Sequence, residues 1–167
     1  EGAATTTPVL ELGFVPPTAI GLTLEGPAVS GGGFIAIDAA GGRYSGALGF
    51  DALTVGIDAL VVVDTQLPSD PGGWALFASL SASFPGIPLG FGFTLSGVGG
   101  LLAVNRGLDG DALALGLRSG AIDSLLFPDE PVRDSAELIA RIDDYFPILP
   151  GNVVFGPVAQ IGWGAPT

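Results

Sequence analysis

The sequence contains no cysteine, histidine, lysine or methionine, and each absence excludes a class of function. Without cysteine there is no disulfide or thiol chemistry. Without histidine the chain lacks the commonest general base and zinc ligand, and cannot form a Ser-His-Asp or Cys-His catalytic set. Without lysine, Schiff-base chemistry and a phosphate-binding loop of the Walker type are excluded. We therefore expect no catalytic, cofactor-binding or metal-binding residues, no cofactor and no enzyme activity; a hydrolase that uses carboxylates alone is the one enzyme type left open.

Charged residues are scarce, and most have the same sign. The chain has 17 acidic residues against five arginines, a formal net charge of −12, and charged residues make up 13% of it. A typical domain has about 25%. Nucleic acids and anionic lipid headgroups are bound by clustered cations, so neither is an expected partner. Genome composition is the simplest reason for the missing lysine; a high-salt or calcium-rich setting is the alternative.

The apolar content is high for a domain of 167 residues, with 48% hydrophobic residues and a mean hydropathy of +0.60. The 35 residues from Pro71 to Asn105 carry no charge, yet most of this run alternates with a period of two. That period is typical of a β-strand at a half-buried sheet surface and not of a membrane-spanning helix. One face of this strand has Trp74, Leu76, Ala78, Leu80, Ala82 and Phe84, and the other has Ala75, Phe77, Ser79, Ser81 and Ser83.

Further strands are separated by glycine and proline turns, which predicts a meander of antiparallel hairpins. Gly41-Gly42 is a hairpin signal, and residues 68–73 form a second turn. Pro85 and Pro88 are expected to end the strand that begins at Trp74. The predicted strands are Val9–Phe14, Ala19–Glu25, Val29–Asp38, Arg43–Phe50, Leu53–Thr65, Trp74–Phe84, Leu89–Ser96 and Asn152–Trp163.

Two helices are expected between residues of about 109 and 146. Asp109 or Asp111 caps the first, which runs to Arg118 and is closed by Gly120. A short turn follows at residues 121–127. Asp134 with Glu137 resembles a capping box for the second helix, which runs to Phe146.

The predicted fold class is α+β and β-dominated, a twisted antiparallel sheet with two helices on one face or end. The expected organisation is a flexible lead-in over residues 1–7 and a single β-rich domain over 8–167. Within that domain, residues 8–104 form the sheet, 109–146 the helical insert and 152–163 the closing strand.

Three local patterns resemble functional motifs, but a structural role explains each of them better. Gly97–Leu102 lacks the spacing of a dinucleotide fingerprint, so we interpret it as a tight turn or bulge leading off the sheet. Asn105, Asp109 and Asp111 alternate like calcium ligands, but the residues after Asp111 do not continue an EF-hand loop, and helix capping accounts for the aspartates. Arg106 is expected to have a structural role, paired with Asp109 or a C-terminal carbonyl.

One set of motifs is distinctive. It comprises Gly90–Leu102, Val104–Arg106, Leu117–Gly120, Leu125–Pro128, Phe155–Pro157 and Ile161–Gly164. These residues resemble the bacterial domain of unknown function 6603 family, with Ala103 where relatives would have glycine. The resemblance implies a segment of a longer β-rich protein, in agreement with the missing methionine, and brings no catalytic residues with it.

Two functions are compatible with these observations. The first is a non-catalytic structural and interaction module, whose partners are further copies or neighbouring domains of the same protein, joined through sheet edges and apolar faces. The second is a carrier that holds lipid or another apolar ligand in a sheet-lined groove, with Trp74, Phe77, Phe84, Phe91 and Phe93 as its lining. No secretory signal precedes Glu1, but a mature secreted chain would not show one. The location therefore stays open, with an extracellular or cell-surface location favoured.

Overall fold

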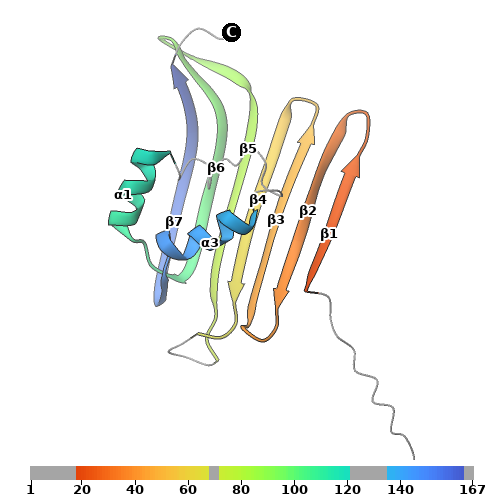
Figure 1. Cartoon of the computed structure of the whole chain (residues 1–167). Helices are drawn as coiled ribbons and strands as arrows, with labels where there is room; N and C mark the ends of the chain where they lie inside the picture. Colours follow the sequence, from red (N-terminus) through yellow and green to blue (C-terminus); the bar gives the residue numbers. More distant parts are fainter. Residues whose placement is uncertain (1–17, 68–71, 121–134, 164–167) are drawn as a thin grey trace, which may run out of the picture.

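The computed structural model is a single antiparallel sheet in which each strand pairs with the next one along the chain (Figure 1). The structure describes residues 18–67, 72–120 and 135–163. The seven strands are β1 (Ala19–Glu25), β2 (Val29–Asp38), β3 (Arg43–Ala52), β4 (Val55–Asp64), β5 (Ala75–Gly90), β6 (Phe93–Arg106) and β7 (Ile148–Trp163). Within the described ranges, two helices, α1 (Gly110–Ser119) and α3 (Ser135–Tyr145), come between β6 and β7 in the chain. The predicted β-dominated α+β fold, with helices between residues of about 109 and 146, is confirmed.

Both helices lie on the same side of the sheet (Figure 1). Leu138 and Ile142 of α3 form an apolar stripe at the four-residue spacing of one helix face, and with Phe146 they pack on β3–β6. The rings of Phe77 and Phe146 lie 4.9 Å apart. The core of the described residues lies between α3 and the sheet. Val62, Phe77 and Ile142 have no exposed surface there. Other core members are Ala47, Leu60, Ala103, Leu138 and Tyr145.

The first helix begins as the sequence predicts. The side chain of Asp109 accepts hydrogen bonds from the backbone N–H groups of Asp111 and Ala112, at 3.0 and 2.9 Å. Gly120 ends the helix in a left-handed conformation with a φ of 75°. Both features satisfy backbone groups that a helix end leaves unpaired.

Several strand boundaries differ from the prediction. Leu53 has a positive φ of 58° and lies in a turn, so β4 begins only at Val55. The break expected at Pro85 and Pro88 is wrong, because β5 continues to Gly90 through an irregularity between Ser83 and Ile87. A bulge is one of the few places where a sheet tolerates proline.

The strand predicted over Leu89–Ser96 is also wrong, because the turn between β5 and β6 falls inside it. Residues Gly90, Phe91 and Gly92 have φ values of 93°, 53° and 82°. Gly97–Leu102, predicted as a turn leading off the sheet, lies inside β6. Glycine suits this stretch because the strands approach closely: a Cβ atom on Gly99 would lie 2.7 Å from the carbonyl oxygen of Leu80.

Several predictions fall outside the described residues. These are the lead-in over 1–7, the strand Val9–Phe14, most of the turn at 68–73, the turn at 121–127 and the capping role of Asp134. The closing strand begins at Ile148, four residues before the predicted start at Asn152.

Candidate interaction surface

The two faces of the sheet differ in charge. Strand residues whose side chains share the side of α1 and α3 include Glu25, Asp51, Asp58 and Asp64, as their register with one another requires. The opposite side, which we call the open face, consists of three rows of paired residues that cross all seven strands. Because side chains alternate along a strand, the rows contain only every second residue. No residue in these three rows is charged.

The pairing register defines the rows. The first is Ile20, Ile35, Gly46, Val61, Ala78, Leu102 and Phe155. The second is Leu22, Gly33, Leu48, Ala59, Leu80, Gly100 and Pro157. The third is Leu24, Gly31, Phe50, Ile57, Ala82, Val98 and Ala159.

The large side chains of the open face are accessible to solvent. Leu22, Leu80 and Phe155 expose 72%, 58% and 73% of their surface, whereas Val62 and Phe77, on the side of the helices, expose none. Alternation along β4 and β5 therefore predicts the two faces correctly. The described part of the chain does not cover the apolar face of these strands, which stays accessible to solvent.

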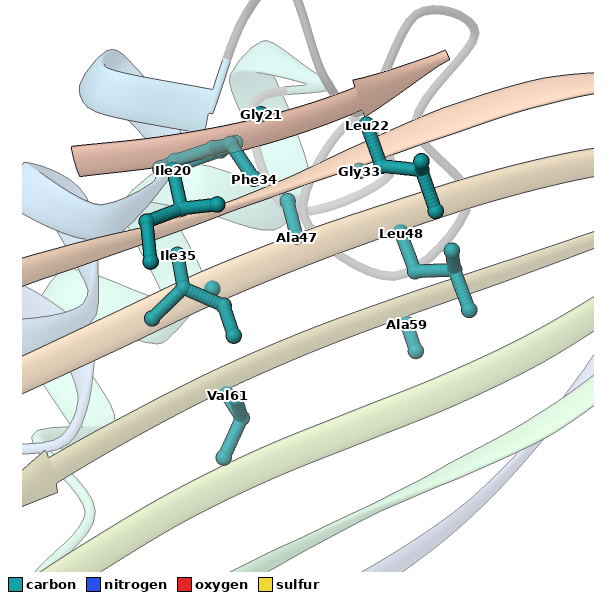
Figure 2. Close-up of a pocket in the computed structure, with 11 residues that line it drawn as sticks. Ile20, Gly21, Leu22, Gly33, Phe34, Ile35, Ala47, Leu48, Ala59 and Val61 are labelled. Atoms are coloured by element: carbon teal, nitrogen blue, oxygen red, sulfur yellow. The ribbon is translucent and has the colours of Figure 1, made fainter. Parts of the chain in front are cut away.

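Large and small residues are interspersed across the rows, and this shapes the surface. Two hollows result. One, of about 320 Å³, lies over β1–β4, where Ile20, Leu22, Ile35, Leu48 and Val61 project to the same side around Gly33 and Gly46 (Figure 2). The other, of about 610 Å³, lies over β4–β7 and is lined by Ile57, Leu80, Val98, Leu102 and Phe155 among others. Both linings are almost entirely apolar.

The aromatic residues predicted to line a groove are not brought together. Phe77 lies on the opposite side, against Phe146. Phe91 is 98% exposed at the turn between β5 and β6. Phe93 stacks on Trp163, with ring centroids 6.2 Å apart. Trp74 precedes β5, and Phe84 is half-buried in it. The hollows are instead lined mainly by aliphatic residues. Alternation in the sequence places these residues on one face, but a search for aromatic residues does not find them.

On the other face, a group of charged side chains holds the helices to the sheet. Arg106 of β6 is fully buried and forms an ion pair with Asp64 of β4. It also donates hydrogen bonds to Asp143 of α3, at 2.9 Å, and to the carbonyl oxygen of Phe146, at 2.7 Å. Arg43 of β3 donates to the same carboxylate of Asp143 at 2.6 Å. Arg106 has the structural role that the sequence predicts. Of its two expected partners, the structure has the carbonyl at a helix C-terminus and not Asp109.

This group has an electrostatic consequence. Partial burial acts to raise the pKa of Asp143, but the hydrogen bonds and positive charges of Arg43 and Arg106 outweigh it and keep that pKa below its usual value. The hydrogen bond to Asp143 in turn raises the pKa of Arg43. The sequence analysis missed Asp64 and Asp143 as partners, because they lie 42 and 37 residues from Arg106 along the chain.

The residues considered as calcium ligands have separate roles. Asp109 caps α1, while the side chain of Asn105 donates to the carbonyl of Trp74 and accepts from the N–H of Gly151. Asn105 has a φ of 54°, at the irregular end of β6. Within the described ranges, no three acidic side chains are grouped as metal ligands would be, and none of the helices has both the length and the apolar character to cross a bilayer.

Comparison with known proteins gives one match. The model of a family described as Family of unknown function (DUF6603) matches residues 2–166, nearly the whole chain. Neither the curated proteins nor the solved structures contain a match.

Proposed function

The chain belongs to this family of unknown function, and we propose that it is a non-catalytic structural and interaction module whose open face is covered by an apolar protein surface. The observation that carries the proposal is the segregation of charge. Three complete rows of the sheet contain only apolar residues and glycine, in a protein with a net charge of −12.

The size of the open face supports a protein partner. Three rows two residues apart span about 20 Å along the strands at about 3.3 Å per residue, and seven strands about 4.8 Å apart span about 34 Å, so the open face covers roughly 700 Å². The largest apolar patch on a typical monomer is about 300–600 Å², whereas a stable interface needs about 800 Å² from each partner. The open face therefore exceeds what a lone molecule usually exposes and approaches the area of a specific interface.

The electrostatics of the molecule favour the same partner. A second copy, or a neighbouring domain of similar composition, would also be acidic, and two acidic surfaces in contact repel each other. The open face avoids this cost because its rows contain no charge, while Asp51, Asp58 and Asp64 project to the other side. Apolar contact through the open face keeps the carboxylates of both partners apart.

Three of the acidic residues have structural partners, which supports a non-catalytic role for them. Asp64 and Asp143 are engaged by arginines, and Asp109 caps a helix. A carboxylate-only hydrolase needs one carboxyl group with a raised pKa beside an ionised one. Asp143 has a lowered pKa instead.

The test compares two leucine-to-aspartate variants. Leu80 lies in the second row of the open face and Leu115 on α1, and both are exposed, at 58% and 68%. In sedimentation velocity at micromolar concentration, we expect Leu80→Asp to weaken association of the chain at least about tenfold. A covered, unpaired carboxylate costs more than the about 1.4 kcal/mol that corresponds to this factor. Leu115→Asp should associate like the unmodified chain. An unmodified chain that stays monomeric and binds no neighbouring domain contradicts the proposal.

A second function, a carrier of lipid or another apolar ligand, is favoured by the two hollows. Their aliphatic linings suit acyl chains, and volumes of about 320 and 610 Å³ fall within the range of small-molecule sites of about 300–1,000 Å³. Native mass spectrometry after mild purification distinguishes the two functions. A carrier retains extra mass on a single chain, whereas the proposed module is free of ligand and associated.

A further inference from the structure

The two edges of the sheet are not equivalent. The edge formed by β7 contains Pro150 and Pro157, and its pairing with β6 shifts register twice. Prolines and irregular pairing are two ways in which proteins protect a sheet edge from further strands. The edge formed by β1 has neither, since its seven residues contain no proline and pair with β2 without a shift. All seven are exposed, and the only charge is on Glu25 at the end.

The hydrogen bonds of β1 identify which of its backbone groups point outward. The N–H of Ile37 donates to the carbonyl of Thr18 at 2.8 Å. In an antiparallel pair, hydrogen-bonded and non-hydrogen-bonded residues alternate. Ile20, Leu22 and Leu24 therefore bond to β2, while Ala19, Gly21, Thr23 and Glu25 direct their N–H and C=O groups away from it. Among the described residues, no strand pairs with these outward groups.

We propose that β1 is an assembly edge, at which β1 of a second copy pairs with it in the antiparallel direction. The two-fold axis passes through Leu22, which puts Leu22 opposite Leu22 and Ile20 opposite Leu24. In this register Gly21 faces Thr23 and Ala19 faces Glu25, so every outward backbone group of the strand finds a partner.

Side chains and symmetry fit this register. Glu25 faces Ala19, so the only two charges of the paired strands are at opposite ends. Leucine and isoleucine meet on the open face, and such apolar cross-strand pairs stabilise a sheet. A two-fold axis between antiparallel strands is perpendicular to the sheet, so it keeps both open faces on the same side. The inference goes beyond the proposed function, because it concerns the edge of the sheet and not its open face.

The absence of cysteine from the chain allows a direct test, because an introduced cysteine is the only thiol. At the two-fold axis, the Cα atoms of the two residues at position 22 would lie about 4.5 Å apart, as non-hydrogen-bonded pairs do. That distance is within the range of about 4.4–6.8 Å found for disulfides. We expect Leu22→Cys to give a disulfide-linked dimer under mild oxidation. Leu24→Cys is the matched control, since its two thiols would be four residues, or about 13 Å, apart.

A proline introduced at the edge provides a second test of the inference. The N–H of Thr23 points outward, so Thr23→Pro removes no hydrogen bond to β2 but blocks a second strand. Added to Leu22→Cys, it should abolish the cross-link, and Thr23→Val should retain it. Equal cross-linking of the two cysteine variants, or cross-linking that survives Thr23→Pro, overturns the inference. So does a Leu22→Cys chain that stays uncross-linked. None of these results concerns Leu80→Asp, so failure at the edge is separable from failure at the open face.

Discussion

At the scale of single residues, we expect Arg106 to contribute to the stability of the molecule. This side chain is fully buried yet charged, and a buried charge is tolerated only when it is paired and hydrogen-bonded. Its partners lie on two elements and the bend that follows one of them: Asp64 on β4, Asp143 on α3, and the carbonyl of Phe146 just after α3. Arg106 thus connects β6 both to β4 and to α3.

We predict that Arg106→Leu lowers the free energy of unfolding by about 3 kcal/mol, because it removes the buried partner of Asp64 and leaves this carboxylate with Arg43 alone, at 3.8 Å. Urea denaturation monitored by circular dichroism measures this loss. The control is Arg118→Leu, at an exposed position in the last turn of α1, which should change stability by less than about 0.5 kcal/mol. Similar unfolding midpoints for the two variants would show that Arg106 does not hold the layers together.

At the scale of elements, the close contact of β5 with β6 depends on glycine. A Cβ atom on Gly99 would lie 2.7 Å from the carbonyl oxygen of Leu80 and 3.1 Å from the Cα of Ser81. Both are backbone atoms, so the strands themselves would have to separate. A similar atom on Gly110, at the start of α1, would meet nothing within 4 Å.

We therefore predict opposite effects for two glycine-to-alanine variants. Gly99→Ala should destabilise the protein by about 1–3 kcal/mol, as overpacking does. Gly110→Ala should be neutral or should stabilise it by up to about 1 kcal/mol, because alanine favours the helix and reduces the entropy of the unfolded chain. Thermal unfolding of both variants measures the difference. Equal melting temperatures would contradict the close strand contact at Gly99.

The strands also show how far sequence patterns predict this fold. Alternation in the predicted strands Leu53–Thr65 and Trp74–Phe84 gave the correct faces for the residues that lie in β4 and β5. Asp109 and Gly120 gave the correct ends of α1. The turn at Gly90–Gly92 was missed because Pro85 and Pro88 were expected to end the strand. They lie instead in an irregular part of β5, where proline is tolerated. Glycines that permit close packing, such as Gly99, could not be distinguished by sequence from glycines that make turns.

Which face the helices cover could not be predicted from alternation. Asp58 and Asp64 make one side of β4 look like the solvent side, yet α3 packs on that side. The reason is that Arg43 and Arg106 supply the positive charge that the carboxylate of Asp64 needs near the core. Contacts between residues this far apart in the chain leave no local pattern.

At the scale of the whole molecule, one side of the sheet carries the helices and the acidic strand residues, and the other side is apolar over three complete rows. The first side has its own core, built from β3–β6 and α3. The second has large side chains, such as Leu22 and Phe155, that no described residue covers. This division between a completed and an uncovered side is the physical basis of the proposed interaction module.

Hydroxyl-radical footprinting of the unmodified protein tests this claim most directly, because it reports side-chain exposure residue by residue. Leu53, 84% exposed in the turn before β4, is the internal standard for a free leucine. We predict that Leu22 and Leu80 react several-fold more slowly than Leu53, because a partner surface shields the open face. Oxidation of Leu22 and Leu80 at the rate of Leu53, in folded protein, would mean that the open face is bare and that the account is wrong.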